Sequence, residues 1–167
     1  DVTDPAFHEL LIRWFQFGVF TPVMRLHGDR QPTQQVTSHD GSPRMNTGAP
    51  NEVWSFGDEV LGTLVEHLEM RERLRDYSRD LMREAHERGT PVLRGLFYEF
   101  PDDPETWSVT DQYLYGPDLL VCPVVELGSR ARRVYLPAGA SWTELATGTS
   151  HAGGRWLEVD APLERIP

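Results

Sequence analysis

The chain has 167 residues, enough for one domain or two small ones, and its composition of 39% hydrophobic and 25% charged residues is ordinary for a folded protein. A formal net charge of −10, from 26 acidic and 16 basic residues, argues against nucleic-acid binding, because phosphate backbones repel an acidic surface. No apolar run approaches the roughly 20 residues that span a bilayer, which excludes an integral membrane protein.

The first predicted element is a helix that begins at Asp4 and Pro5, a favourable N-cap followed by proline at the first helical position. Large apolar side chains recur at helical spacing over residues 7–15, and Gly18 ends the run. A short strand is predicted over residues 19–26. The chain begins without an initiator Met, and we expect it to be a piece of a longer protein.

A long polar segment, residues 28–54, is predicted to be a loop because it is rich in Gly, Pro, Ser, Thr, Asn and Gln. A second helix is predicted to begin with Ser55 or Asp58 as its cap and to run to about Arg88, before a stop at Gly89. Arginines and acidic residues interleave on this helix, which predicts a solvated face rather than an anion site. These arginines are Arg71, Arg73, Arg75, Arg79 and Arg83.

The hydrophobic period changes from helical to strand-like at Thr90. Closely spaced apolar segments separated by turn residues predict an antiparallel β-sandwich. The single cysteine, Cys122, lies in an apolar run and is predicted to be a buried core residue. The predicted strands are residues 91–100, 112–114, 119–125, 133–136, 142–145 and 156–159, and residues 151–154 are predicted to form a turn.

The candidate site lies where the first predicted strand enters the long loop. Arg25 and His27 alternate with Met24 and Leu26, so they share one side of the strand, and strand ends carry the active sites of (β/α)8 barrels. Trp54, at the end of the loop, could stack on the face of a sugar. Two plainer interpretations stay open: a histidine at a strand end often makes a structural hydrogen bond, and a tryptophan often anchors a loop to the core.

Three stretches of sequence together resemble one family. They are residues 4–28 (DPAFHELLIRWFQFGVFTPVMRLHG), residues 71–139 with the spaced motifs GTPVLR, FPDDP, DQY and LLVCPV, and residues 153–167 (GGRWLEVDAPLERIP). They are similar to the C-terminal part of the catalytic region of glycoside hydrolase family 31, the α-glucosidase and α-xylosidase family. The resemblance implies a fold class of α/β plus all-β. Residues 1–89 would contain the last strand and helices of a (β/α)8 barrel, and residues 90–167 a proximal C-terminal β-sandwich.

The resemblance also implies a retaining mechanism with two aspartates, whose carboxyl groups lie about 5–5.5 Å apart in such enzymes. In the family both aspartates precede the segment found here, so no catalytic residue is expected in this chain. His27 matches the family histidine that hydrogen-bonds the sugar, and Arg25 matches the arginine of the same motif, with a supporting role. Trp54 matches a tryptophan that follows this motif in many members, although the intervening loop is longer here. No cofactor and no metal are implied.

We therefore expect part of an exo-acting α-glucosidase or α-xylosidase, inactive by itself, whose partners are an α-glycoside substrate and the missing N-terminal part of the same polypeptide. The alternatives are a non-catalytic carbohydrate-binding or structural module and an inactive homologue. No nucleic acid or membrane partner is expected. A homo-oligomer is left open, as are the sugar specificity and the location: the cytoplasm is favoured, and any signal peptide would lie upstream of this segment.

Overall fold

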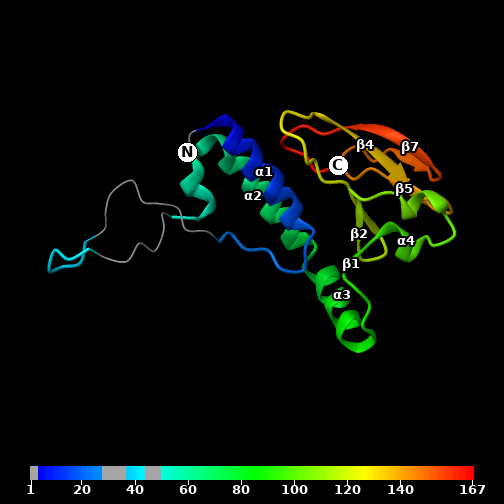
Figure 1. The fold of residues 1–167 in the computed structure, drawn as a ribbon, viewed down its shortest axis with the longest axis horizontal. Coiled ribbons are helices and arrows are strands. Elements are labelled where there is room, and N and C mark those ends of the chain that lie inside the picture. Colours follow the sequence, from blue (N-terminus) through cyan, green and yellow to red (C-terminus); the bar gives the residue numbers. More distant parts are fainter. Residues whose placement is uncertain (1–3, 28–36, 44–49) are drawn as a thin grey trace.

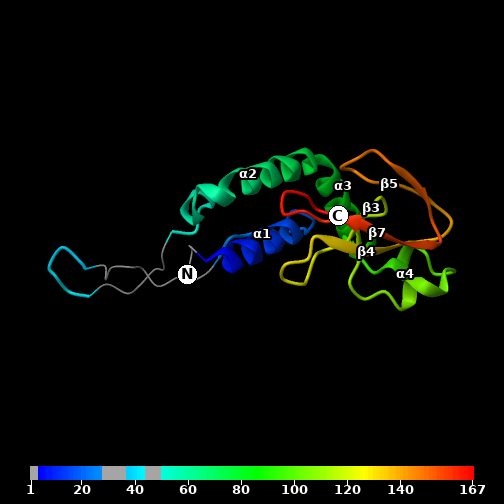
Figure 2. The ribbon, with the colours of Figure 1, turned by 90° about the horizontal axis from the view of Figure 1, so that it is seen from above.

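The structure is a computed structural model that describes residues 4–27, 37–43 and 50–167. Its first helix, α1 (Pro5–Val19), begins as predicted, with the Asp4 carboxylate accepting a hydrogen bond from the Ala6 N–H at 2.9 Å. Figures 1 and 2 show α1 lying alongside the longer helix α2 (Asp58–Arg73). Buried apolar side chains fill the space between these helices: Ile12, Phe15, Phe56, Val60 and Leu64.

The strand predicted over residues 19–26 is not formed. The helix α1 continues to Val19, and residues 20–27 form a bend followed by a segment without regular structure. A strand is held by ladder hydrogen bonds to a neighbour, and no strand pairs with this segment among the residues that the structure describes. The predicted alternation is nevertheless present, because Met24 and Leu26 are half-buried while Arg25 and His27 are exposed.

The structure describes residues 37–43 and 50–54 of the predicted loop. Residues 28–36 and 44–49 lie outside the described residues, whereas residues 37–43 form a tight turn closed by a bridge between Thr37 and Pro43. The loop then ends in a short 3-10 helix, η1 (Val53–Phe56). Neither predicted cap is used by α2, because its N-cap is Gly57 at a φ of 102°.

The predicted second helix is in fact two helices. A break at Leu74 separates α2 from α3 (Arg75–Arg88), which turns away from it in Figure 1. The turn brings Tyr77 against the β region, where its hydroxyl donates to the Tyr115 carbonyl oxygen at 3.1 Å. As predicted, α3 ends at Gly89, which takes the left-handed conformation with a φ of 74°.

Beyond residue 90 the strands pair in an antiparallel manner throughout. One three-stranded sheet has the order β1-β2-β3, and two further pairs are β4-β7 and β5-β6. Side chains of the β1-β2-β3 sheet and of the β4-β7 pair meet in shared clusters, one of which includes Cys122, confirmed as buried. The strands are β1 (Leu93–Arg94), β2 (Tyr113–Tyr115), β3 (Leu119–Val121), β4 (Ala131–Leu136), β5 (Ser141–Thr143), β6 (Ser150–Ala152) and β7 (Arg155–Asp160).

Some details of the predicted β region are wrong, and one is that the strand predicted over residues 119–125 ends at Val121. Residues 91–100 form only the short β1, followed by α4 (Leu96–Glu99), and residues 150–152 form β6 where a turn was predicted. Arg94 is buried and pairs with both Glu84 and Glu99. A strand would separate residues 94 and 99 by about 16 Å, so this pairing requires the chain to turn back on itself. A second 3-10 helix, η2 (Pro104–Trp107), follows α4.

Candidate functional site

The segment that leaves α1 carries two of the three candidate residues. Met24 and Leu26 pack against the α1–α2 core, which turns the Arg25 and His27 side chains outward. Within the described part of the chain, neither of these side chains has a hydrogen-bond or ion-pair partner. Both therefore present free polar groups: a guanidinium with five donors on Arg25, and an imidazole on His27 that can donate or accept.

The third candidate, Trp54, lies in η1 with 68% of its side chain exposed. It shares a groove of about 490 Å³ with Arg25, and the groove floor is largely apolar. His27 does not line this groove among the residues described, although it lies on the same side of the segment as Arg25. The structure thus brings Arg25 and Trp54 together and places His27 two residues further along. The remaining lining residues are Phe15, Met24, Leu26, Asn51, Glu52, Val53, Leu68 and Arg71.

The groove can bind a polar ring but offers little chemistry of its own. An exposed indole provides an apolar face for a sugar ring, and a guanidinium provides donors for hydroxyl or acidic groups. Glu52 is the single carboxylate in the described lining, whereas retaining glycoside hydrolysis needs a pair. In the described ranges, no group of three or more His, Cys, Asp and Glu side chains could hold a metal ion. The described lining therefore offers an indole face, guanidinium donors and one carboxylate to a ligand.

Arg71 was missed as a contributor to this region. The sequence placed it on a solvated face with four other arginines, and the structure bears this out for Arg75, Arg79 and Arg83, which are exposed and pair with acidic neighbours on the helix. Arg71 instead lines the groove and binds backbone carbonyls at the C-terminal end of α1 and just beyond it. The signal was present, because residue 71 follows the fully buried Leu64 by seven positions and so shares its helix face.

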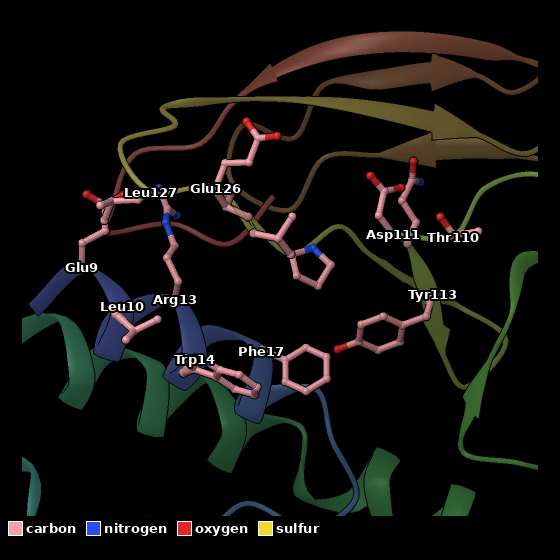
Figure 3. Close-up of a pocket in the computed structure, with 14 residues that line it drawn as sticks. Glu9, Leu10, Arg13, Trp14, Phe17, Thr110, Asp111, Tyr113, Glu126 and Leu127 are labelled. Carbon is pink, nitrogen blue, oxygen red and sulfur yellow. The ribbon is translucent and has the colours of Figure 1, made fainter. Parts of the chain in front are cut away.

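A second cavity, of about 530 Å³, separates α1 from the β region and holds none of the predicted residues (Figure 3). Figure 3 shows Trp14 and Phe17 from α1 facing Tyr113 from β2, and the ring centroids of Phe17 and Tyr113 are 5.8 Å apart. Trp14 is 65% exposed. The walls are mainly apolar and aromatic, which suits contact with another apolar surface better than with a sugar.

Polar contacts bridge α1 and the β region beside this cavity. The Glu9 carboxylate accepts from the Arg130 guanidinium at 2.8 and 3.0 Å and from the Gly128 N–H at 2.8 Å. The Arg130 hydrogen bond is the main cause that lowers the pKa of Glu9, against the opposing effect of burial. These contacts fix the helix that leads to the candidate site.

Comparison with known proteins identifies the family. The family model described as the glycosyl hydrolases family 31 TIM-barrel domain matches residues 2–81, and the glycosyl hydrolase family 31 C-terminal domain matches residues 89–167. The chain belongs to glycoside hydrolase family 31. Its fold class is the one expected, the end of the family's barrel followed by the antiparallel strands of its C-terminal domain.

Individual relatives agree with this membership. A family 31 α-xylosidase from a soil metagenome, solved with xylose, is 53% identical with a TM-score of 0.92, and the match covers 100% of this chain and 25% of that one. A sulfoquinovosidase from Agrobacterium fabrum is 37% identical over 93% of this chain and 21% of its own length. An α-glucosidase 2 from Bacillus thermoamyloliquefaciens is 33% identical, and the match covers 95% of this chain and 18% of that protein. The chain therefore spans about a fifth of the length of these curated relatives.

Among the described residues, no helix is both long and apolar enough to cross a membrane.

Proposed function

We propose that this chain is the substrate-site edge and supporting β domain of a retaining, exo-acting α-glycoside hydrolase of the α-xylosidase or α-glucosidase type. In this proposal both catalytic aspartates belong to a longer polypeptide, and the chain alone is inactive. The observation that carries this proposal is that Arg25 and Trp54 line one groove, while His27, two residues after Arg25, is exposed on the same side of the segment. Family membership supplies the reaction class, and the 53% identity to an α-xylosidase favours xylosides as the first substrates to test.

Each candidate residue has a distinct role in this proposal. His27 hydrogen-bonds the hydroxyls of the reacting sugar, Arg25 orients the sugar or its substituents, and Trp54 stacks on a neighbouring ring. Hydrogen bonds of this kind accelerate hydrolysis when they tighten as the ring distorts toward the oxocarbenium-like transition state. The imidazole of His27 and the guanidinium of Arg25 are free to make such bonds, because the described residues offer them no partner.

The proposed domain division places residues 1–89 in the barrel and residues 90–167 in the β-sandwich. The proposed partner of the cavity between α1 and the β region is the preceding part of the same polypeptide. Its support is the exposed aromatic face of Trp14 together with the small share of the relatives that this chain spans. An apolar face of this kind is normally covered in a soluble enzyme.

The test uses the full-length protein that contains this chain, assayed with aryl α-xyloside, α-glucoside and α-sulfoquinovoside. His27→Ala should lower kcat/KM by a factor of about 10²–10⁴, because a hydrogen bond to the reacting sugar is lost. His86→Ala is the matched control, since His86 is exposed near the end of α3 and should leave kcat/KM unchanged. Unchanged kcat/KM in His27→Ala would remove His27 from the site.

A further inference from the structure

The bend that follows α1 is held by one side chain from α2. The guanidinium of Arg71 donates from Nη1 to the carbonyl oxygens of Gly18 at 3.1 Å, Val19 at 2.6 Å and Thr21 at 2.8 Å. Its Nη2 reaches the Pro22 carbonyl oxygen at 3.3 Å. Four consecutive or nearly consecutive backbone acceptors are thus collected by a single cation.

This arrangement solves a backbone problem. The last carbonyls of a helix have no partner within the helix, and a cation at the C-terminal end also interacts favourably with the helix dipole. The bend after α1 has no strand ladder to take up its carbonyls among the described residues. Arg71 supplies donors to most of these carbonyls, the Tyr113 hydroxyl adds one bond to the Phe20 carbonyl oxygen at 3.1 Å, and the Thr21 hydroxyl donates to the Gly18 and Val23 carbonyl oxygens at 2.7 and 2.9 Å.

The bend leads directly into the candidate site. Only two residues separate Pro22 from Arg25, and the Met24 side chain packs close to Gly18 in the last turn of α1, where an added Cβ would lie 3.2 Å from the Met24 Cγ. Arg71 also lines the same groove as Arg25 and Trp54. The direction in which residues 25–27 leave the bend therefore depends on the carbonyls that Arg71 holds.

We infer that Arg71 is a positioning residue for the sugar-binding segment, acting through the backbone of residues 18–22 rather than by contact with substrate. The inference rests on the proposed function, since it assigns Arg71 to the site that His27 and Arg25 form. Geometry as well as charge is required: the planar guanidinium spans four acceptors, whereas the ammonium of lysine is a point charge with three donors. Arg71→Lys keeps the charge and loses this span.

The experiment is a double-mutant cycle in the full-length protein, with kcat and KM measured for wild type, Arg71→Lys, His27→Ala and the double variant. We expect Arg71→Lys alone to lower kcat/KM about tenfold or more at an unchanged folded fraction. In the His27→Ala background it should cost less than about twofold, because residues that act through one contact are not additive. Arg75→Lys is the matched control: Arg75 is exposed and pairs with Glu72, so kcat/KM should stay at the wild-type value.

The outcomes separate the two ideas. Wild-type activity in His27→Ala would defeat the proposed site itself. Suppose instead that His27→Ala lowers kcat/KM as expected. If Arg71→Lys then leaves kcat/KM unchanged, or lowers it by the same factor with and without His27, the positioning role alone is overturned. If Arg71→Lys does not fold, Arg71→Gln keeps an N–H donor without the charge and replaces it in the cycle. Failure of both variants to fold would assign Arg71 to stability and overturn positioning as well.

Discussion

Arg13 offers the clearest test of how α1 is joined to the C-terminal residues. Its Nη2 donates to the carbonyl oxygens of Ala161 at 2.6 Å and Ser129 at 3.1 Å, and its Nη1 to the Pro162 carbonyl oxygen at 3.2 Å and to Gln16 Oε1 at 3.0 Å. The side chain is buried with only 8% exposed. One buried guanidinium therefore connects the helix to two separate stretches of the β region.

The change Arg13→Met keeps most of the aliphatic volume and removes every donor. Ala161 is fully buried, so its carbonyl oxygen loses a charge-assisted bond with no water to replace it, at a cost of about 2–3 kcal/mol. The half-buried Ser129 and Pro162 carbonyls can regain water and cost about 0.5–1 kcal/mol each. The losses at the three carbonyls together should therefore lower the free energy of unfolding by about 3–5 kcal/mol, and the lost bond to Gln16 Oε1 adds to this loss.

Urea unfolding followed by tryptophan fluorescence measures this loss, because the change in midpoint reports stability when the slope is unchanged. The matched control is Arg79→Met, since Arg79 is exposed and makes one helix-surface contact to Asp76 at 3.6 Å. Such a pair contributes at most about 0.5 kcal/mol. A loss below about 1 kcal/mol for Arg13→Met, or equal losses in the two variants, would refute the idea that Arg13 holds the two parts together.

Two further predictions concern groups in the same structure. The folded-state pKa of Glu9 is lowered, chiefly by its Arg130 hydrogen bond, so its stabilising effect is present above the ordinary glutamate pKa and is lost as the pH falls from there through the lowered folded-state pKa. The difference between the urea midpoints at pH 7 and pH 4 should therefore be smaller in Glu9→Gln than in wild type. An equal difference in the two proteins would show that Glu9 does not cause this pH dependence. Burial raises the pKa of the Cys122 thiol to about 12, so the thiol is protonated and inert at neutral pH. Cys122→Ser should lower the melting temperature of the full-length enzyme while leaving kcat/KM at the wild-type value, and a selective loss of activity in the folded variant would show that the core assignment is wrong.

Local signals in the sequence located the parts of the fold that local chemistry decides. The Asp4 cap and the left-handed Gly89 stop depend on a few neighbouring atoms, and both were predicted correctly. The apolar alternation around Arg25 and His27 also emerged, because burial of Met24 and Leu26 requires only that the segment cross the α1–α2 core. Periodicity reports which side of a segment is buried, whatever its hydrogen bonding.

Tertiary contacts decided the parts that were missed. No glycine or proline at Leu74 signals the break between α2 and α3 in the sequence. Just after the break, Tyr77 hydrogen-bonds to the β region. The strand predicted over residues 91–100 gives way to α4, where Arg94 pairs with Glu99. From the sequence, Arg71 was placed on a solvated face because the alternation of charges was considered and not the position of residue 71 around the helix axis. For Tyr77 and Arg71 the partners lie on elements distant in sequence, which short-range patterns do not encode, although the helix phase of Arg71 could have been read from the sequence.

The bonds around the bend after α1 join the helical region to the β region. Arg71 from α2 binds the carbonyls of residues 18, 19, 21 and 22, and Tyr113 from β2 binds the Phe20 carbonyl between them. The bend that precedes Arg25 and His27 is therefore supported from both regions at once. If the proposed site binds a sugar, a hydrogen bond to that sugar is useful only when its donor is held in place, and the proposal therefore gives the β region a supporting role without substrate contact. Tyr113→Phe, which removes a single hydroxyl, should then weaken kcat/KM severalfold in the full-length enzyme and leave the fold intact. Wild-type kinetics in that variant would confine the β region to a purely stabilising role.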